Sequence, residues 1–124
     1  MKRVLIYDDD EDILFLSGMI LGAYDYSVEV RSRCEDIIHD IELTKPDIIL
    51  MDLAIPMIGG EKGISLVRDS PSVKNIPVIL FSANADIEEI CKNTGADGYL
   101  KKPFNIEDLR KLIEATLIKV QASS

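Results

Sequence analysis

The stretch VLIYDDDED, residues 4–12, runs from a short apolar segment directly into five consecutive carboxylates. A short apolar run of this kind is typical of a buried strand. Like charges packed this closely repel one another, and each depends on contact with water or with a cation. The stretch therefore predicts a strand that ends at a crowded, negatively charged site.

The same strand-then-helix pattern repeats along the rest of the chain. We expect strands at residues 4–7, 26–30, 47–51, 76–81 and 98–100, and helices at 11–21, 35–43, 61–68, 86–93 and 106–119. Gly95 is expected to end the fourth helix and Asn105 to cap the fifth. Five such units, joined by right-handed crossovers, predict an α/β fold: a doubly wound parallel sheet between two layers of helices.

Composition is typical of a single globular domain. The chain has 124 residues, of which 47% are hydrophobic and 29% charged, and its net charge is −8. This negative charge argues against binding to nucleic acid or to an anionic membrane surface. No apolar run approaches the length of a membrane span. Cys34 and Cys91 lie far apart and outside any C-x-x-C pattern, so we expect free thiols and a cytoplasmic location.

Polar residues follow four of the five expected strands. They are Asp8 and Asp9 after the first strand, Asp52 after the third, Ser82 after the fourth and Lys102 after the fifth. Because sites in such sheets form beyond the carboxyl ends of the strands, we expect these side chains to lie together. Mg²⁺ would offset the crowded carboxylates and keep positions open for phosphate oxygens. A carboxylate beside Mg²⁺, a lysine and a hydroxyl can hold a phosphoryl group or accept it covalently.

Each acid or hydroxyl also has a simpler interpretation when it is taken alone. Glu11 and Asp12 are well explained as first-turn acids favoured by the helix dipole, and Asp10 has no assigned role. A lone Asp52 would be a loop acid, and a lone Ser82 would be a turn cap. Their coincidence at one edge of the sheet favours a shared site.

Four blocks of the sequence resemble the receiver domains of two-component response regulators, the CheY-like family. The blocks are VLIYDDDEDI at 4–13, DIILMDLAIPMIGG at 47–60, IPVILFSA at 76–83 and GADGYLKKPF at 95–104. They occur in the family's order and near its usual spacing. The resemblance implies a three-layer, flavodoxin-like (βα)5 fold with strand order 2-1-3-4-5. It also implies a receiver domain over residues 1–121, followed by a short tail at 122–124. From its own sequence, the end VQASS at 120–124 is expected to be frayed.

The resemblance implies a metal-dependent phosphoacceptor site. Asp52 would accept a phosphoryl group from a phosphohistidine. Asp8, Asp9 and Asp52 would bind Mg²⁺ or, as a substitute, Mn²⁺, with Asp9 as a direct ligand and Asp8 acting through water. The backbone carbonyl of Ala54 would complete the protein's share of the ligands.

The resemblance also implies a switch. Ser82 would take the hydroxyl position, which binds a phosphoryl oxygen, and Tyr99 the aromatic position, which follows it. Lys102 would be the family's lysine, and its peptide bond to Pro103 is expected to be cis. One departure is Gly59, which stands where the family usually has an acid, so we expect a more flexible loop after Asp52.

The implied function is bacterial phosphorelay signalling. The chain would be a phosphoacceptor with only self-directed phosphotransfer and autodephosphorylation, not an enzyme with a separate substrate. Its partners would be a sensor histidine kinase or histidine phosphotransfer protein and a downstream protein target, with no nucleic acid and no membrane insertion. We expect a monomer or a weak dimer that depends on phosphorylation.

Two alternatives remain open. A phosphatase of the haloacid dehalogenase type would use Asp8 and Asp10, but it expects a small hydroxyl or valine where Asp12 stands, and a further acidic pair that is missing. A receiver-like module that is never phosphorylated would act by binding alone. A calcium loop starting at Asp8 is rejected, because its sixth and twelfth positions hold Ile13 and Met19 instead of Gly and Glu.

Overall fold

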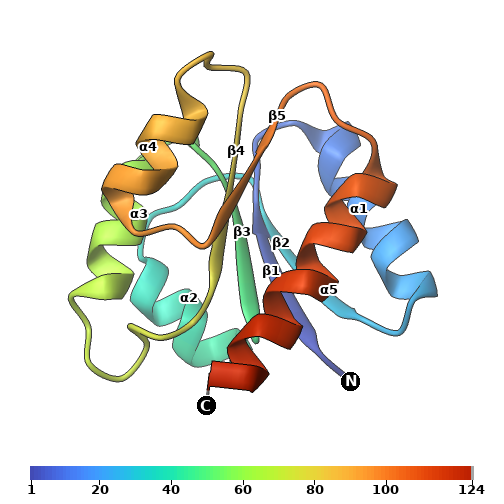
Figure 1. The fold of residues 1–124 in the computed structure, drawn as a ribbon, viewed down its shortest axis with the longest axis horizontal. Coiled ribbons are helices and arrows are strands. Elements are labelled where there is room, and N and C mark those ends of the chain that lie inside the picture. Colours follow the sequence, from blue (N-terminus) through green and yellow to red (C-terminus); the bar gives the residue numbers. More distant parts are fainter. Residues whose placement is uncertain (124) are drawn as a thin grey trace.

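Figure 1 shows the computed structural model, which describes residues 1–123 as five parallel strands alternating with five helices. The strands are β1 (Arg3–Tyr7), β2 (Ser27–Arg31), β3 (Ile48–Asp52), β4 (Val78–Ser82) and β5 (Gly98–Lys101). The helices are α1 (Glu11–Ala23), α2 (Ile37–Thr44), α3 (Gly60–Arg68), α4 (Ile87–Thr94) and α5 (Ile106–Ser123). Hydrogen-bonded strands follow the order β2-β1-β3-β4-β5, which confirms the predicted doubly wound topology.

Helices cover both faces of the sheet, with α1 and α5 on one side and α2, α3 and α4 on the other (Figure 1). Each face has its own apolar cluster, one built on Leu21, Leu109 and Ile113 and the other on Ile37 and Ile64. All residues of β3 and β4 are buried, as expected for central strands of a parallel sheet covered on both faces. The two clusters hold the strand ends rigidly in place.

Several helix boundaries follow the expected caps. Gly95 adopts the left-handed conformation (φ 80°) that ends α4, and Asn105 Oδ1 accepts a hydrogen bond from the Asp108 amide at the start of α5. α2 begins at Ile37, two residues later than predicted, because Asp36 caps it by accepting from the His39 amide. Asp10, which had no assigned role, is the N-cap of α1, and Glu11 and Asp12 occupy its first turn.

The fifth helix extends past its predicted end at residue 119. α5 continues to Ser123, since no glycine or proline interrupts it. The fourth strand starts at Val78 instead of residue 76, because Pro77 has no N–H to donate to the sheet. Within residues 1–123, none of the helices combines the length and apolar character that a membrane crossing requires.

Candidate functional site

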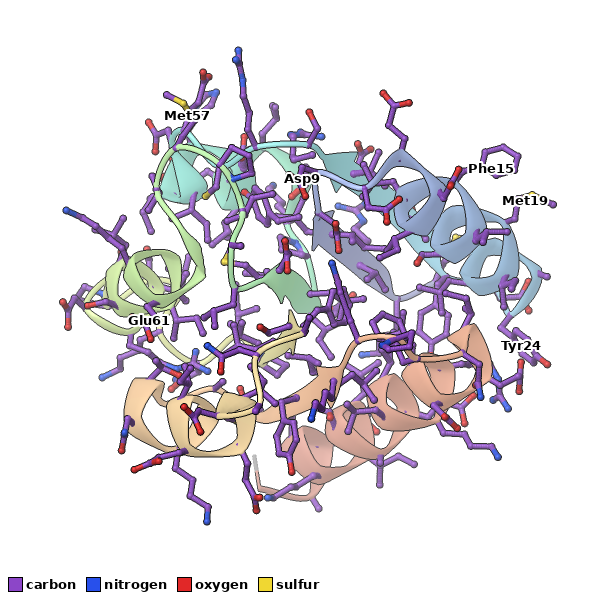
Figure 2. The ribbon with its side chains drawn as sticks, turned by 90° about the horizontal axis from the view of Figure 1, so that it is seen from above. Asp9, Phe15, Met19, Tyr24, Met57 and Glu61 are labelled. Carbon is purple, nitrogen blue, oxygen red and sulfur yellow. The ribbon has the colours of Figure 1, made fainter. Side chains whose placement is uncertain are left out.

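The carboxyl ends of the strands meet at the upper edge of the sheet in Figure 1, and Figure 2 looks down onto this edge. Asp8 follows β1, Asp52 and Ser82 end β3 and β4, and Lys102 follows β5. The fold thus brings the predicted acids, hydroxyl and lysine together from four strands. The exposed side chain of Asp9 lies over the middle of the edge (Figure 2).

Asp8, Asp9 and Asp52 form a compact acidic triad. Each offers one carboxylate oxygen, and these oxygens lie within 4.8 Å of one another. Asp8 is fully buried and Asp52 nearly so, which makes the mutual repulsion of their charges costly. Oxygen ligands in this number and spacing suit a hard divalent cation. The acidic triad can therefore bind a metal ion.

The bonding of Asp8 supports this fit. Its Oδ1 accepts a hydrogen bond of 2.9 Å from the Asp10 amide. Its Oδ2 lies 3.0 Å from Lys102 Nζ, and no other donor among the described residues reaches this oxygen. A carboxylate oxygen has more than one lone-pair site, so a single ammonium contact leaves it able to bind a metal ion as well.

Lys102 is the one ammonium group shared by the buried acids within the described chain. Its Nζ lies 3.0 Å from Asp8 Oδ2 and 3.4 Å from Asp52 Oδ1. Burial lowers the pKa of Lys102, but the two carboxylates more than offset it, so the pKa is raised and the group stays charged. The neighbouring Lys101 is exposed, and the peptide bond between Lys102 and Pro103 is cis, as expected.

The pKa of Asp52 is raised above its ordinary value. Burial is the main cause, and the charges of Asp8 and Asp9 add to it, while Lys102 acts in the opposite direction. A metal ion at the triad would favour the ionised carboxylate, since an opposite charge nearby lowers the pKa. The site is therefore short of positive charge, and Lys102 alone does not make up the deficit.

Ser82 and Tyr99, the two expected switch residues, differ from each other in position and burial. Ser82 is nearly buried, and its Oγ accepts a hydrogen bond of 2.9 Å from the Asn84 amide. Tyr99 lies in β5 beside Leu80, before the strand end, and is 36% exposed. Ala54 lies in the turn that follows β3. The roles of these three residues as switch and carbonyl ligand remain predictions.

Two backbone hydrogen bonds hold the loop after Asp52, and the sequence analysis did not predict them. The Cys34 amide donates to the Pro56 carbonyl at 3.1 Å, and the Ile58 amide donates to the Cys34 carbonyl at 3.0 Å. Cys34 and Met57 thereby form an isolated bridge, in which Met57 takes a positive φ of 81°. The sequence carries no local signal for this pairing, because it joins two loops that meet only in the folded chain.

Comparison with known proteins gives one consistent result. The family model of the response regulator receiver domain matches residues 4–114. The transcriptional regulatory protein KdpE of Staphylococcus aureus is 32% identical over 114 residues, covering 90% of this chain and 48% of that protein. The chain spans about half the length of the curated relatives it matches.

Solved structures agree with the fold. A CheY-like receiver domain from Methanospirillum hungatei superposes with a TM-score of 0.88 at 28% identity, covering 100% of this chain and 99% of that one. The receiver domain of a sensor histidine kinase from Pseudomonas aeruginosa, solved with a magnesium ion in its active site cleft, has a TM-score of 0.82 at 24% identity. That alignment covers 94% of this chain and 97% of the other.

Proposed function

This chain belongs to the response regulator receiver family, the phosphoacceptor modules of two-component signalling, and we propose that Asp52 is the residue on which it is phosphorylated. The observation that carries the proposal is the position of the Asp52 carboxylate. It ends a central strand, lies 3.4 Å from Lys102 Nζ, and shares the edge with Asp8 and Asp9. Carboxylates of this kind are known phosphoryl acceptors.

We propose that the acidic triad, with the Ala54 carbonyl, holds Mg²⁺, or Mn²⁺ in its place. The spacing of the three carboxylates supports this, as does the magnesium ion in the receiver domain from Pseudomonas aeruginosa. Such an ion supplies positive charge that stabilises phosphoryl oxygens during transfer.

The protein's own groups account for the rest of the transfer. A carboxylate oxygen of Asp52 attacks phosphorus, the bond from phosphorus to the donor histidine nitrogen breaks, and the nitrogen keeps the electron pair. The ammonium of Lys102 and the hydroxyl of Ser82 each bind one oxygen of the transferred group. Lys102 is held for this task by its contacts with the two buried acids.

Phosphorylation would then bias a two-state switch. The new charge and acceptor oxygens at Asp52 draw Ser82 toward them and away from the Asn84 amide. Tyr99 would enter the space that is left, which changes the face made by α4, β5 and α5. A histidine kinase is the partner that the family implies, and a downstream protein would read this face.

The proposal is tested by intact-mass spectrometry after incubation with acetyl phosphate and Mg²⁺. The wild-type chain should gain the mass of one phosphoryl group, and the gain should disappear when EDTA removes the metal. Asp52→Asn should gain nothing, because its amide is a poor nucleophile. An equal gain in Asp52→Asn would overturn the assignment, and no gain in a folded wild-type chain would favour a module that acts by binding alone.

A further inference from the structure

Tyr7 stands directly before the acidic pair and is fully buried. Its hydroxyl donates a hydrogen bond of 2.6 Å to Asp40 Oδ2 on α2, a length typical of a strong bond to a charged acceptor. Burial is the main reason that the pKa of Tyr7 lies above its usual range, and Asp40 raises it further, so the phenol keeps its proton. The phenol thus ties the end of β1 to α2.

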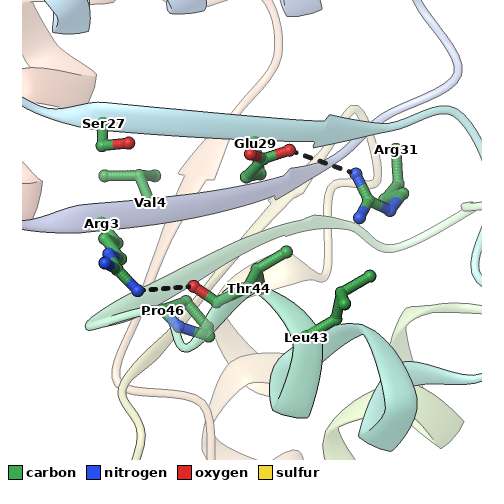
Figure 3. Close-up of a pocket in the computed structure, with 8 residues that line it drawn as sticks. All are labelled: Arg3, Val4, Ser27, Glu29, Arg31, Leu43, Thr44 and Pro46. Atoms are coloured by element: carbon green, nitrogen blue, oxygen red, sulfur yellow. Dashed lines mark hydrogen bonds and ion pairs between the residues drawn. The ribbon is translucent and has the colours of Figure 1, made fainter.

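Arg31 contacts both Asp40 and the backbone of Asp8, the first acid of the triad. Its Nε lies 3.6 Å from Asp40 Oδ1, and its carbonyl accepts a hydrogen bond of 3.1 Å from the Asp8 amide. Arg31 also lines a cavity of about 310 Å³, and its Nη1 lies 3.6 Å from Glu29 Oε2. Figure 3 shows this second ion pair. The guanidinium is therefore held between two carboxylates, and the Arg31 backbone holds Asp8.

The same segment also reaches the loop after Asp52. Cys34 lies three positions beyond Arg31, and its amide and carbonyl bond on either side of Met57. Residues 31–36 therefore contact the backbone of the first acid and the loop that follows the phosphoacceptor. The segment is anchored at its far end by α2, which carries Asp40.

We propose that Tyr7 and Asp40 are positioning residues, whose hydrogen bond fixes residues 31–36 and through them sets the geometry of the acidic triad. The inference rests on the proposed function, because the triad matters only where it holds a metal for phosphoryl transfer. Neither residue touches the reacting atoms. Both act through backbone contacts, one at the Asp8 amide and one at the Cys34–Met57 bridge.

The test uses the full chain and three single variants. Tyr7→Phe keeps the buried ring and removes only the hydroxyl, and Asp40→Ala removes its acceptor. Tyr26→Phe is the control, since the half-buried Tyr26 packs on the other face of the sheet, against the cluster of Leu21, Leu109 and Ile113. Amide NMR spectra give the dissociation constant for Mg²⁺ by titration and, in metal-free protein, the exchange rate of the Ile58 amide.

We expect Tyr7→Phe and Asp40→Ala each to weaken Mg²⁺ binding about tenfold, as found when outer residues that orient metal ligands are lost. Exchange of the Ile58 amide should be faster in both variants and unchanged in Tyr26→Phe. The double variant should bind Mg²⁺ as tightly as the more weakly binding of the two single variants, because the two residues form one bond. All proteins are compared well below their unfolding temperatures, so a loss of global stability alone does not move the metal constant.

Two results separate the possible failures. If the wild type binds Mg²⁺ and Tyr7→Phe matches it in affinity and in Ile58 exchange, the positioning role is overturned and the proposed function stands. If the folded wild type binds no Mg²⁺, the proposed function falls and takes this inference with it. Additive losses in the double variant would likewise contradict a single shared bond.

Discussion

Two groups of charged residues lie at opposite edges of the sheet and are built in opposite ways. At the amino edge, Arg68 donates to the carbonyls of Gly95, Lys74 and Ile76 and forms a 2.7 Å ion pair with Asp97. The same Asp97 oxygen also accepts from the first amide of β4 at 2.8 Å. Every charge in this group has a matched partner.

At the carboxyl edge, three carboxylates lie together and one ammonium group contacts two of them. Asp8 and Asp52 are buried against Lys102, which is the only cation in contact with Asp8 Oδ2 within the described chain. The difference is instructive, since a fully bonded charge cluster holds the fold together, whereas a crowded and incompletely bonded one is kept for a ligand.

The largest expected effect is on stability at the amino edge. Arg68→Ala removes the donor to three carbonyls and the cationic partner of Asp97, which keeps only the Val78 amide. We expect the free energy of unfolding to fall by about 2–4 kcal/mol. Urea unfolding measures the change. Arg33→Ala is the control, because its pair with Glu35 is largely exposed and is worth about 0–1 kcal/mol. Equal losses in the two variants would remove the contrast between bonded and exposed pairs.

The next effect is that of adding Mg²⁺. Mg²⁺ at a hundred times its dissociation constant should stabilise the wild type by about 2.7 kcal/mol. Asp9→Asn should lose most of this gain, because it removes a metal-facing carboxylate. Arg68→Ala should keep the gain, since it lies at the other edge. The same urea titrations, with and without Mg²⁺, give the result, and a full gain in Asp9→Asn would contradict the site.

The smallest expected effect is a gain in protein stability when the charge of Asp52 is removed. The raised pKa of Asp52 means that its ionised form costs folding free energy in the absence of metal. Asp52→Asn should therefore be more stable than the wild type at neutral pH without metal, by about 1 kcal/mol. The gap should close as the pH falls through the raised pKa, because the neutral carboxyl no longer repels its neighbours.

The control for this effect lies at the amino edge. Asp97→Asn weakens the ion pair with Arg68 and should destabilise the protein at neutral pH. Thermal unfolding across the pH range compares the two variants. Asparagine substitutions that shift stability in the same direction at both edges would show that the two groups do not differ as described.

Much of the fold was predictable because its signals are local. The apolar runs of β3 and β4 mark central strands, and Gly95 and Asn105 mark helix ends whatever the rest of the chain does. The grouping of Asp8, Asp52 and Lys102 followed from topology, since parallel strands place their ends at one edge. The triad was therefore predictable without knowledge of any side-chain contact.

The contacts that tie the site to its surroundings were not predictable. The Tyr7–Asp40 bond depends on how α2 is rotated over β1, and the Cys34–Met57 bridge depends on the meeting of two loops. A hydrophobic pattern does not encode either geometry. Asp10 is the N-cap of α1, and an aspartate directly before a helix is a local signal for that role. The acids on both sides of Asp10 obscured this signal.

The central claim is that the incompletely bonded edge accepts a phosphoryl group at Asp52. The most direct measurement is peptide mapping by mass spectrometry after treatment with acetyl phosphate and Mg²⁺, with borohydride reduction to mark the acyl phosphate. We predict the mark at Asp52 and at no other acid of the chain. A mark at Asp8 or Asp9, with Asp52 unmodified, would contradict the account.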